Sequence, residues 1–316
     1  MTTPARPSLA QALAAGPMVL DGGMSNQLEA AGHDLSDALW SARLLADDPS
    51  AIVAAHAAYF AAGAQVAISS SYQASFDGFA RKGFSRDEAA RLFGLSVELA
   101  RRAAEDFRDA QRPRYVAASV GPYGAVLADG SEYRGRYGLT VAQLEGFHRS
   151  RIEALAAAAP DVLALETVPD TDEAEAMLRV VGSLGLPSWL SYTICGSRTR
   201  AGQPLAEAFE LAASVDSILA IGVNCCAPQD VAPAVEIAAA VTGKPVVVYP
   251  NSGESWDAAA HTWQGSNTFD AGLVESWVRA GARLIGGCCR VGPVGISAVA
   301  QALKGCIPAA QPTGKV

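Results

Sequence analysis

Short apolar runs alternate with longer amphipathic stretches along almost the whole chain. Eight runs have the length and the β-branched content of buried strands; they cover residues 18–20, 65–70, 115–120, 162–165, 188–194, 218–224, 245–249 and 283–285. Between them, apolar residues recur at helical spacing; these stretches cover residues 49–62, 85–110, 141–158, 171–181, 205–214, 230–241, 271–280 and 294–303. The pattern predicts strands and helices in strict alternation.

This alternation predicts an α/β protein, and its eight repeats favour a single-domain (β/α)8 TIM barrel. The strand runs are apolar on both faces, which is typical of a parallel sheet covered by helices. A doubly wound open sheet is the alternative. We expect an N-terminal extension over residues 1–15, the barrel over residues 16–305 and a flexible tail over residues 306–316.

Polar and thiol side chains stand where the apolar runs stop. The residues at these ends are Asp21, Tyr72, Gly121, Glu166, Thr193, Cys225, Asn251, Cys288 and Cys289. Reacting groups of TIM-barrel enzymes lie at the C-terminal strand ends. The coincidence therefore predicts an active site at that end of the barrel. A long polar loop over residues 129–138 is a further functional candidate, because long loops in compact domains are often functional.

Three of these residues are cysteines that we expect to bind one zinc ion. Cys225 follows the sixth run, and Cys288 and Cys289 follow the eighth after Gly286 and Gly287. Adjacent strand residues point to opposite faces, so we expect the glycines to supply a sharp bend that aims both thiols at one ion. The two strand ends should lie about 10 Å apart, a gap that side chains and Zn–S bonds of about 2.3 Å can span. Three protein ligands leave one position open, as in catalytic zinc sites.

Other interpretations of the cysteines remain open. Thiols can simply fill the core, which we expect of Cys226. Cys195 lies beside a strand end and could approach the site, whereas Cys306 should be inert near the tail. A vicinal disulfide between Cys288 and Cys289 is a third interpretation.

Composition narrows the class of protein. Half of the 316 residues are hydrophobic and the formal net charge is −8, which argues against a nucleic-acid surface. No apolar run approaches the roughly 20 residues of a membrane span, and the N-terminus lacks the apolar segment of a secretion signal. We therefore expect a cytoplasmic protein that binds neither nucleic acid nor membrane. In that reducing compartment, clustered cysteines indicate metal binding or catalysis.

Several motifs at the strand ends carry a family resemblance. Residues 18–23 (MVLDGG), 166–169 (ETVP), 222–225 (GVNC) and 286–289 (GGCC) resemble the homocysteine S-methyltransferase family, and the resemblance extends over residues 16–305. Residues 119–124 (SVGPYG), 129–135 (DGSEYRG) and 248–254 (VYPNSGE) are similar to the free-standing bacterial and plant enzymes that use S-methylmethionine. The resemblance implies a barrel, one zinc ion per chain on Cys225, Cys288 and Cys289, and no organic cofactor.

The function that follows is zinc-dependent methyl transfer from S-methylmethionine, or S-adenosylmethionine, to the thiol of L-homocysteine, giving methionine. A free thiol with a pKa of about 8.5 is only a few per cent ionised at neutral pH, and binding to zinc lowers that pKa so that the thiolate forms. Alternatives are a betaine-dependent or selenocysteine-type methyltransferase of the same fold. An alternative of another class is a zinc-binding or thiol redox-sensing protein, which needs no substrate pocket.

Homocysteine carries an ammonium and a carboxylate that need partners. Asp21 and Glu166 are the candidates for the ammonium, an assignment that the resemblance supports. The backbone N–H groups of Gly22 and Gly23 are candidates for the carboxylate, because glycine permits close approach. A strand-end or helix-cap aspartate is the alternative for Asp21, and a structural ion pair is the alternative for Glu166.

The cationic donor should meet aromatic faces. Tyr72, Tyr123 and Trp263 are candidates, since a cation–π contact contributes about 0.5–2 kcal/mol. Core packing is an equally open interpretation for each. Asn251 could hold a polar group of either substrate, or serve only as a turn asparagine. The sequence does not indicate an oligomeric state.

Overall fold

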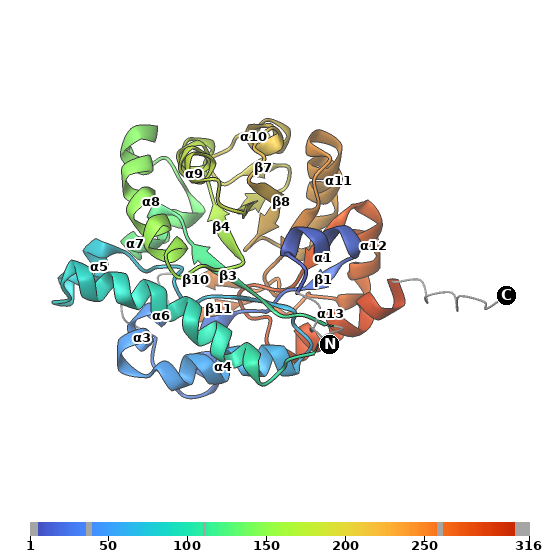
Figure 1. Cartoon of the computed structure of the whole chain (residues 1–316). Helices are drawn as coiled ribbons and strands as arrows, with labels where there is room; N and C mark the ends of the chain where they lie inside the picture. The colour runs from blue at the N-terminus through green and yellow to red at the C-terminus, as the bar shows by residue number, and fades with distance from the viewer. Residues whose placement is uncertain (1–5, 36–39, 110–111, 258–261, 307–316) are drawn as a thin grey trace.

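Eight parallel strands form the centre of the molecule (Figure 1). The computed structural model describes residues 6–35, 40–109, 112–257 and 262–306, so the predicted tail lies outside the described residues from position 307 onward. The strands are β1 (Met18–Val19), β2 (Val66–Ile68), β3 (Tyr115–Val120), β4 (Val162–Val168), β5 (Ser188–Tyr192), β8 (Ile218–Asn224), β9 (Val246–Tyr249) and β12 (Ala282–Ile285).

The strands follow the order β1-β12-β9-β8-β5-β4-β3-β2, and all neighbours are parallel. A parallel bridge between Leu20 and Val66 joins the two ends of this sheet. The sheet therefore closes into a barrel. This confirms the predicted (β/α)8 fold and excludes the open doubly wound sheet.

Helices surround the barrel and connect its strands (Figure 1). The outer helices are α4 (Pro49–Ala61), α6 (Arg86–Glu105), α8 (Val141–Ala156), α9 (Thr171–Leu184), α10 (Leu205–Ala213), α11 (Val231–Thr242), α12 (Val274–Ala280) and α13 (Pro293–Cys306). Each coincides with a predicted helical stretch. α6 begins at a capping box in which Ser85 and Glu88 bond each other's backbone N–H groups, as the sequence indicates.

An additional helix, α1 (Leu9–Ala15), closes the N-terminal end of the barrel. A capping box of Ser8 and Gln11 starts it. Leu9 and Leu13 are each 3% exposed and belong to the same apolar cluster as interior strand residues such as Trp189. Within the predicted N-terminal extension of residues 1–15, α1 is packed into the barrel bottom. A second, larger cluster lies between the sheet and the outer helices.

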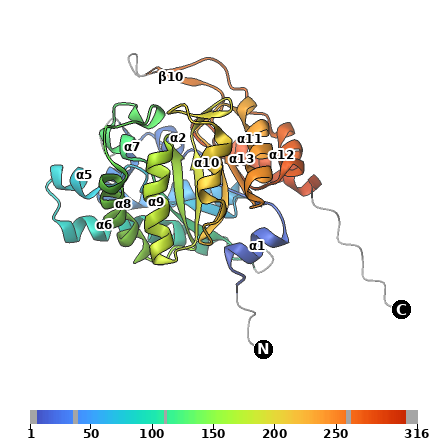
Figure 2. The same ribbon diagram turned by 90° about the horizontal axis from the view of Figure 1, so that it is seen from above.

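Short elements lie between the C-terminal strand ends and the outer helices, and apart from the turn at 271–273 none was predicted. They are the helices α2 (Met24–Ala30), α3 (Leu44–Asp47), α5 (Phe76–Arg81) and α7 (Tyr123–Leu127), the 3-10 turns at 40–43, 131–133, 228–230 and 271–273, and the hairpins β6–β7 (Ile194–Cys195, Arg198–Thr199) and β10–β11 (Ser255–Asp257, Thr262–Gln264). The β10–β11 hairpin projects from the body at the end opposite α1 (Figure 2). Among the described residues, no helix is both long and apolar enough to cross a lipid bilayer.

Candidate active site

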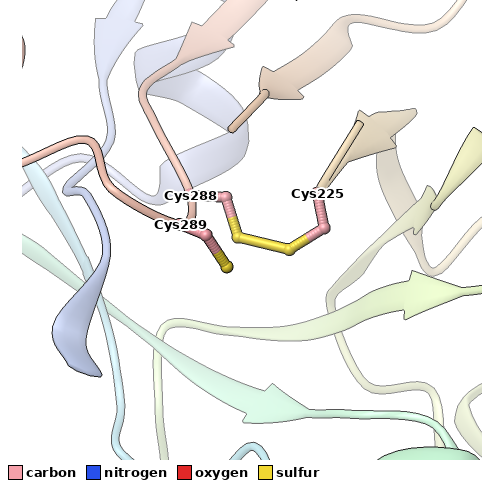
Figure 3. Close-up of side chains that lie close together, drawn as sticks. All are labelled: Cys225, Cys288 and Cys289. Atoms are coloured by element: carbon pink, nitrogen blue, oxygen red, sulfur yellow. A yellow bond between two sulfur atoms is a disulfide. The ribbon is translucent and has the colours of Figure 1, made fainter. Parts of the chain in front are cut away.

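Three cysteine sulfurs meet at the C-terminal end of the barrel (Figure 3). The Sγ atoms of Cys225, Cys288 and Cys289 all lie within 4.8 Å of one another. Cys225 and Cys288 are joined as a disulfide in this structure, with their Cα atoms 5.6 Å apart, and Cys289 has a free thiol. The pairing differs from the vicinal disulfide considered above. The backbones also approach more closely than the strand spacing alone suggests, because the loops after β8 and β12 converge.

Glycines permit this convergence, and the predicted bend does not depend on a left-handed conformation at either of them. Within the described residues, neither Gly286 nor Gly287 has a positive φ. A Cβ on Gly286 would instead lie 2.6 Å from the carbonyl oxygen of Asp21, so glycine is needed for close approach. The positive φ values fall on Cys225 (47°) and Arg290 (66°). A left-handed conformation at such residues costs about 1–2 kcal/mol, which the surrounding packing must offset.

Asn251 links the two cysteine-bearing loops. Its Oδ1 accepts the backbone N–H of Cys289 at 3.1 Å. Its own N–H donates to the carbonyl of Cys226 at 2.9 Å. Asn251 therefore positions cysteines through one bond to its side-chain oxygen, and its role in binding a polar group of either substrate stays a prediction.

The remaining cysteines lie outside the cluster. Cys226 is 1% exposed and packs in the outer core, where burial raises the pKa of its thiol to about 12. Cys195 is exposed on β6, and the Cys306 thiol donates to the carbonyl of Ala302 at the end of α13. The core interpretation of Cys226 is confirmed.

Asp21 and Glu166 form a second polar cluster at the same end. They are 2% and 6% exposed. Asp21 Oδ2 accepts the backbone N–H of Ile68 at 2.8 Å, and Glu166 Oε1 accepts the hydroxyl of Ser119. The hydroxyl of Tyr249 also bonds Glu166. Among the described residues, no Lys, Arg or His side chain pairs with either acid.

Burial without a neighbouring cation raises the pKa of both carboxyl groups. Burial raises the pKa of Glu166 to about 7, against the bonds from Ser119 and Tyr249. Burial also raises the pKa of Asp21 well above its ordinary value; the N–H of Ile68 opposes this rise and the charge of Glu166 adds to it. Two buried carboxylates that repel each other are stabilised when an external cation binds between them. Within the described chain, Glu166 has no ion pair, whereas the bond from Ile68 to Asp21 leaves the strand-end interpretation of Asp21 open.

Gly22 and Gly23 let the first strand end pack against the loop of Cys288. A Cβ on Gly23 would lie 2.7 Å from the carbonyl oxygen of Cys288. The N–H of Gly23 donates to the carbonyl of Val291 at 3.0 Å, so the prediction that it is available to a substrate carboxylate is wrong for this structure. The corresponding role of Gly22 stays a prediction.

The polar loop at residues 129–138 crosses the mouth of the barrel. Tyr133, in the turn Ser131–Tyr133 after β3, hydrogen-bonds with the thiol of Cys289 after β12. Arg136 fixes the loop, since its guanidinium donates to the carbonyl of Ala201 at 2.9 Å and its N–H to Asp170 Oδ2 at 2.9 Å. The loop thus covers the sulfur cluster from the opposite side of the barrel.

Of the three predicted aromatic residues, one lies in the site. The Tyr72 hydroxyl hydrogen-bonds with Thr167, next to Glu166. Tyr123 packs its ring 5.0 Å from Phe147, centroid to centroid, so core packing applies there. The side chain of Trp263 lies outside the described residues.

Comparisons with known proteins assign the chain to a family. The family model described as Homocysteine S-methyltransferase matches residues 18–303. Homocysteine S-methyltransferase 4 of Zea mays is 44% identical over 310 residues, covering 92% of this chain and 90% of that protein. The chain belongs to the homocysteine S-methyltransferase family. The family resemblance read from the motifs is confirmed, and the chain is an enzyme, a homocysteine S-methyltransferase.

Two solved structures of a family member show the same fold. The homocysteine methyltransferase MmuM from Escherichia coli, described as a metallated form, has a TM-score of 0.84 at 41% identity, covering 92% of this chain and 98% of that chain. Its oxidized form has a TM-score of 0.81 at 42% identity, covering 90% and 94%.

The chemistry of the three sulfurs fits a metal ion. A tetrahedral ion with Zn–S bonds of about 2.3 Å places its ligands roughly 3.8 Å apart, and the cluster lies within 4.8 Å. Burial raises the pKa of the Cys289 thiol to about 12, and the charge of Glu132 acts in the same direction. A buried thiolate at this position therefore needs a positive charge beside it. Ser119, Glu132, Tyr133 and Thr167 were not predicted as site residues, although all four stand in the quoted motifs at 119–124, 129–135 and 166–169.

Proposed function

We propose that this chain transfers a methyl group from a sulfonium donor, S-methylmethionine or S-adenosylmethionine, to the thiol of L-homocysteine, giving methionine. The observation that carries the proposal is the pairing of two clusters at one end of the barrel. Three sulfurs suited to a metal ion stand beside two buried carboxylates that lack a protein cation. An amino acid with an ammonium at one end and a thiol at the other matches both clusters.

One zinc ion per chain, held by Cys225, Cys288 and Cys289, completes the proposed site. Zinc supplies the positive charge that lets a substrate thiol lose its proton near neutral pH. Binding requires reduced cysteines, so the disulfide between Cys225 and Cys288 must first be opened. A reducing, cytoplasmic location, which remains an expectation, is compatible with that requirement.

The chain's own residues bind and orient the reactants. Asp21 and Glu166 accept the ammonium of homocysteine, which fixes the direction in which its thiol points. The thiolate sulfur then forms a bond to the methyl carbon, and the carbon–sulfonium bond breaks with its electron pair returning to the donor sulfur. The loop at 129–138 excludes water, and positioning of the two reactants is the main contribution to rate.

Metal analysis and initial rates test the proposal. We expect reduced protein to hold one zinc ion per chain, and to methylate homocysteine faster with S-methylmethionine than with betaine. Cys288→Ser should lose both zinc and activity while keeping its circular dichroism spectrum. The exposed Cys195→Ser is the matched control and should keep both. Full activity of carefully demetallated protein would contradict the role of the metal.

A redox-sensing function is the second candidate, and the disulfide between Cys225 and Cys288 is the observation that favours it. A sensor has no need of two buried carboxylates without a cation. Reduced, zinc-loaded protein that methylates homocysteine with none of the three donors would favour this candidate.

A further inference from the structure

A carboxylate oxygen in the loop over the site has no partner. Oε2 of Glu132 is buried and forms no hydrogen bond, and among the described residues it is the only carboxylate oxygen in that condition. Buried polar atoms in folded proteins are nearly always satisfied, so an exception points to a missing ligand. The unsatisfied oxygen therefore raises the question of which group it binds.

The loop holds Glu132 in place. The chain packs so tightly there that a Cβ on Gly124, in α7, would lie 2.5 Å from the backbone nitrogen of Glu132. Ser131 is 1% exposed, and its hydroxyl accepts a bond from Arg134 at 2.8 Å, so Arg134 is directed to Ser131. Arg200 lies 5.5 Å from the centroid of the Tyr133 ring. Neither arginine forms an ion pair with Glu132 within the described chain.

The neighbours of Glu132 are suited to a cation. Its charge acts on Tyr72, on Tyr133 and on Cys289. The carboxylate thus lies near enough to Tyr72, Tyr133 and a sulfur of the proposed metal site to act on all three through its charge. Aromatic faces together with a carboxylate are the usual environment of sulfonium and quaternary ammonium groups. Burial raises the pKa of Glu132, the charge of Asp129 acts in the same direction, and no ion pair to Glu132 is present among the described residues.

A second cation is required by the reaction itself. The ammonium of homocysteine uses Asp21 and Glu166, which lie at the ends of β1 and β4. Glu132 reaches the site in the separate loop after β3, so it is free to serve the other reactant. The donor carries the remaining positive charge.

We infer that Glu132, with Tyr72 and Tyr133, binds the positive charge of the methyl donor and selects donors that carry a net positive charge. The inference rests on the proposed function. S-methylmethionine has a sulfonium, an ammonium and a carboxylate, for a net charge of +1. Betaine has one quaternary ammonium and one carboxylate, for a net charge of zero. The electrostatic preference of Glu132 is therefore for S-methylmethionine.

The charge also sets which kinetic constant should change. Methyl transfer neutralises the sulfonium, so the attraction to Glu132 is stronger before the transition state than after it. Removing the carboxylate should then weaken donor binding without lowering the rate of the bound complex. After transfer, the neutral thioether product is held less tightly and can leave.

The test uses reduced, zinc-loaded full-length protein with saturating homocysteine. We expect Glu132→Gln to raise the KM for S-methylmethionine roughly 10- to 100-fold, as expected when the attraction between two opposite charges in a partly buried site is lost. Its kcat, zinc content and KM for homocysteine should stay within about twofold. The inhibition constant of tetramethylammonium, an unreactive cation, should rise in parallel. Glu210→Gln removes an equal charge from an exposed position of α10, away from this loop, and is the control, with unchanged constants.

Other outcomes would overturn the inference. A Glu132→Gln variant with an unchanged KM for S-methylmethionine would contradict the inference, and so would a variant in which only the KM for homocysteine changes. In either case an active wild-type protein would leave the proposed function intact. Glu132→Asp keeps the charge and should recover most of the donor affinity; an aspartate variant as weak as the glutamine variant would exclude charge as the cause. A wild-type protein inactive with every donor would remove the proposed function, and this inference with it.

Discussion

Replacing Glu166 with glutamine removes a buried negative charge that no cation in the described chain neutralises. The carboxylate is 6% exposed and bonds only neutral hydroxyls. We expect Glu166→Gln to stabilise the substrate-free protein at alkaline pH and to weaken homocysteine binding. The two effects have opposite signs because the charge is unfavourable without the ammonium and favourable with it.

The magnitude follows from the pKa. A rise from 4.5 in the unfolded chain to about 7 in the folded protein corresponds to roughly 3 kcal/mol. The folded state binds the proton more tightly, so the free energy of unfolding falls as pH rises from about 4.5 through about 7. The loss in the free energy of unfolding is complete above about pH 7 and absent below about pH 4.5. Glutamine removes it, but its amide fits the hydroxyls of Ser119 and Tyr249 less well, so a net gain of about 1–2 kcal/mol is expected at pH 8.

Urea unfolding of wild type and variant at pH 5, 6, 7 and 8 provides the measurement. The stability difference should grow in favour of Glu166→Gln as pH rises. Homocysteine at a fixed concentration should stabilise the wild type more than the variant. Glu210→Gln, at an exposed position of α10, is the matched control and should show no such pH dependence. A difference between Glu166→Gln and wild type that stays constant across pH would refute the assignment of an uncompensated charge.

Two further changes test how the scaffold supports the site. Asn251→Ala should lower zinc affinity about 10-fold in a chelator competition, because the N–H of Cys289 loses its acceptor; unchanged zinc affinity would mean that the backbone alone positions this cysteine. Leu13→Ala should lower the free energy of unfolding by about 2–4 kcal/mol through a cavity at the barrel bottom, with kcat retained; a loss of kcat at full stability would contradict the separation of the two barrel ends.

Much of the architecture could be predicted from local pattern. All eight barrel strands and their connecting helices coincide with predicted runs, because a strand buried on both faces and an amphipathic helix leave distinct periodicities in the sequence. The same pattern placed Asp21, Glu166 and the cysteines at one end, since parallel strands in a barrel end on the same side. The motifs then indicated the family.

Contacts between distant loops were decided only by the tertiary structure. The helix α1 is too short for its pattern to show that Leu9 and Leu13 fill the barrel bottom. No local sequence pattern indicates that the N–H of Gly23 donates to the carbonyl of Val291. Nor does one indicate that Asn251 and Tyr133, from separate loops, both form hydrogen bonds with Cys289. Periodicity records which face of an element is buried, but closure of the barrel determines which loops meet. Whether a carboxylate such as Glu132 has a partner depends on that closure, because burial and pairing belong to the assembled fold and not to any single segment.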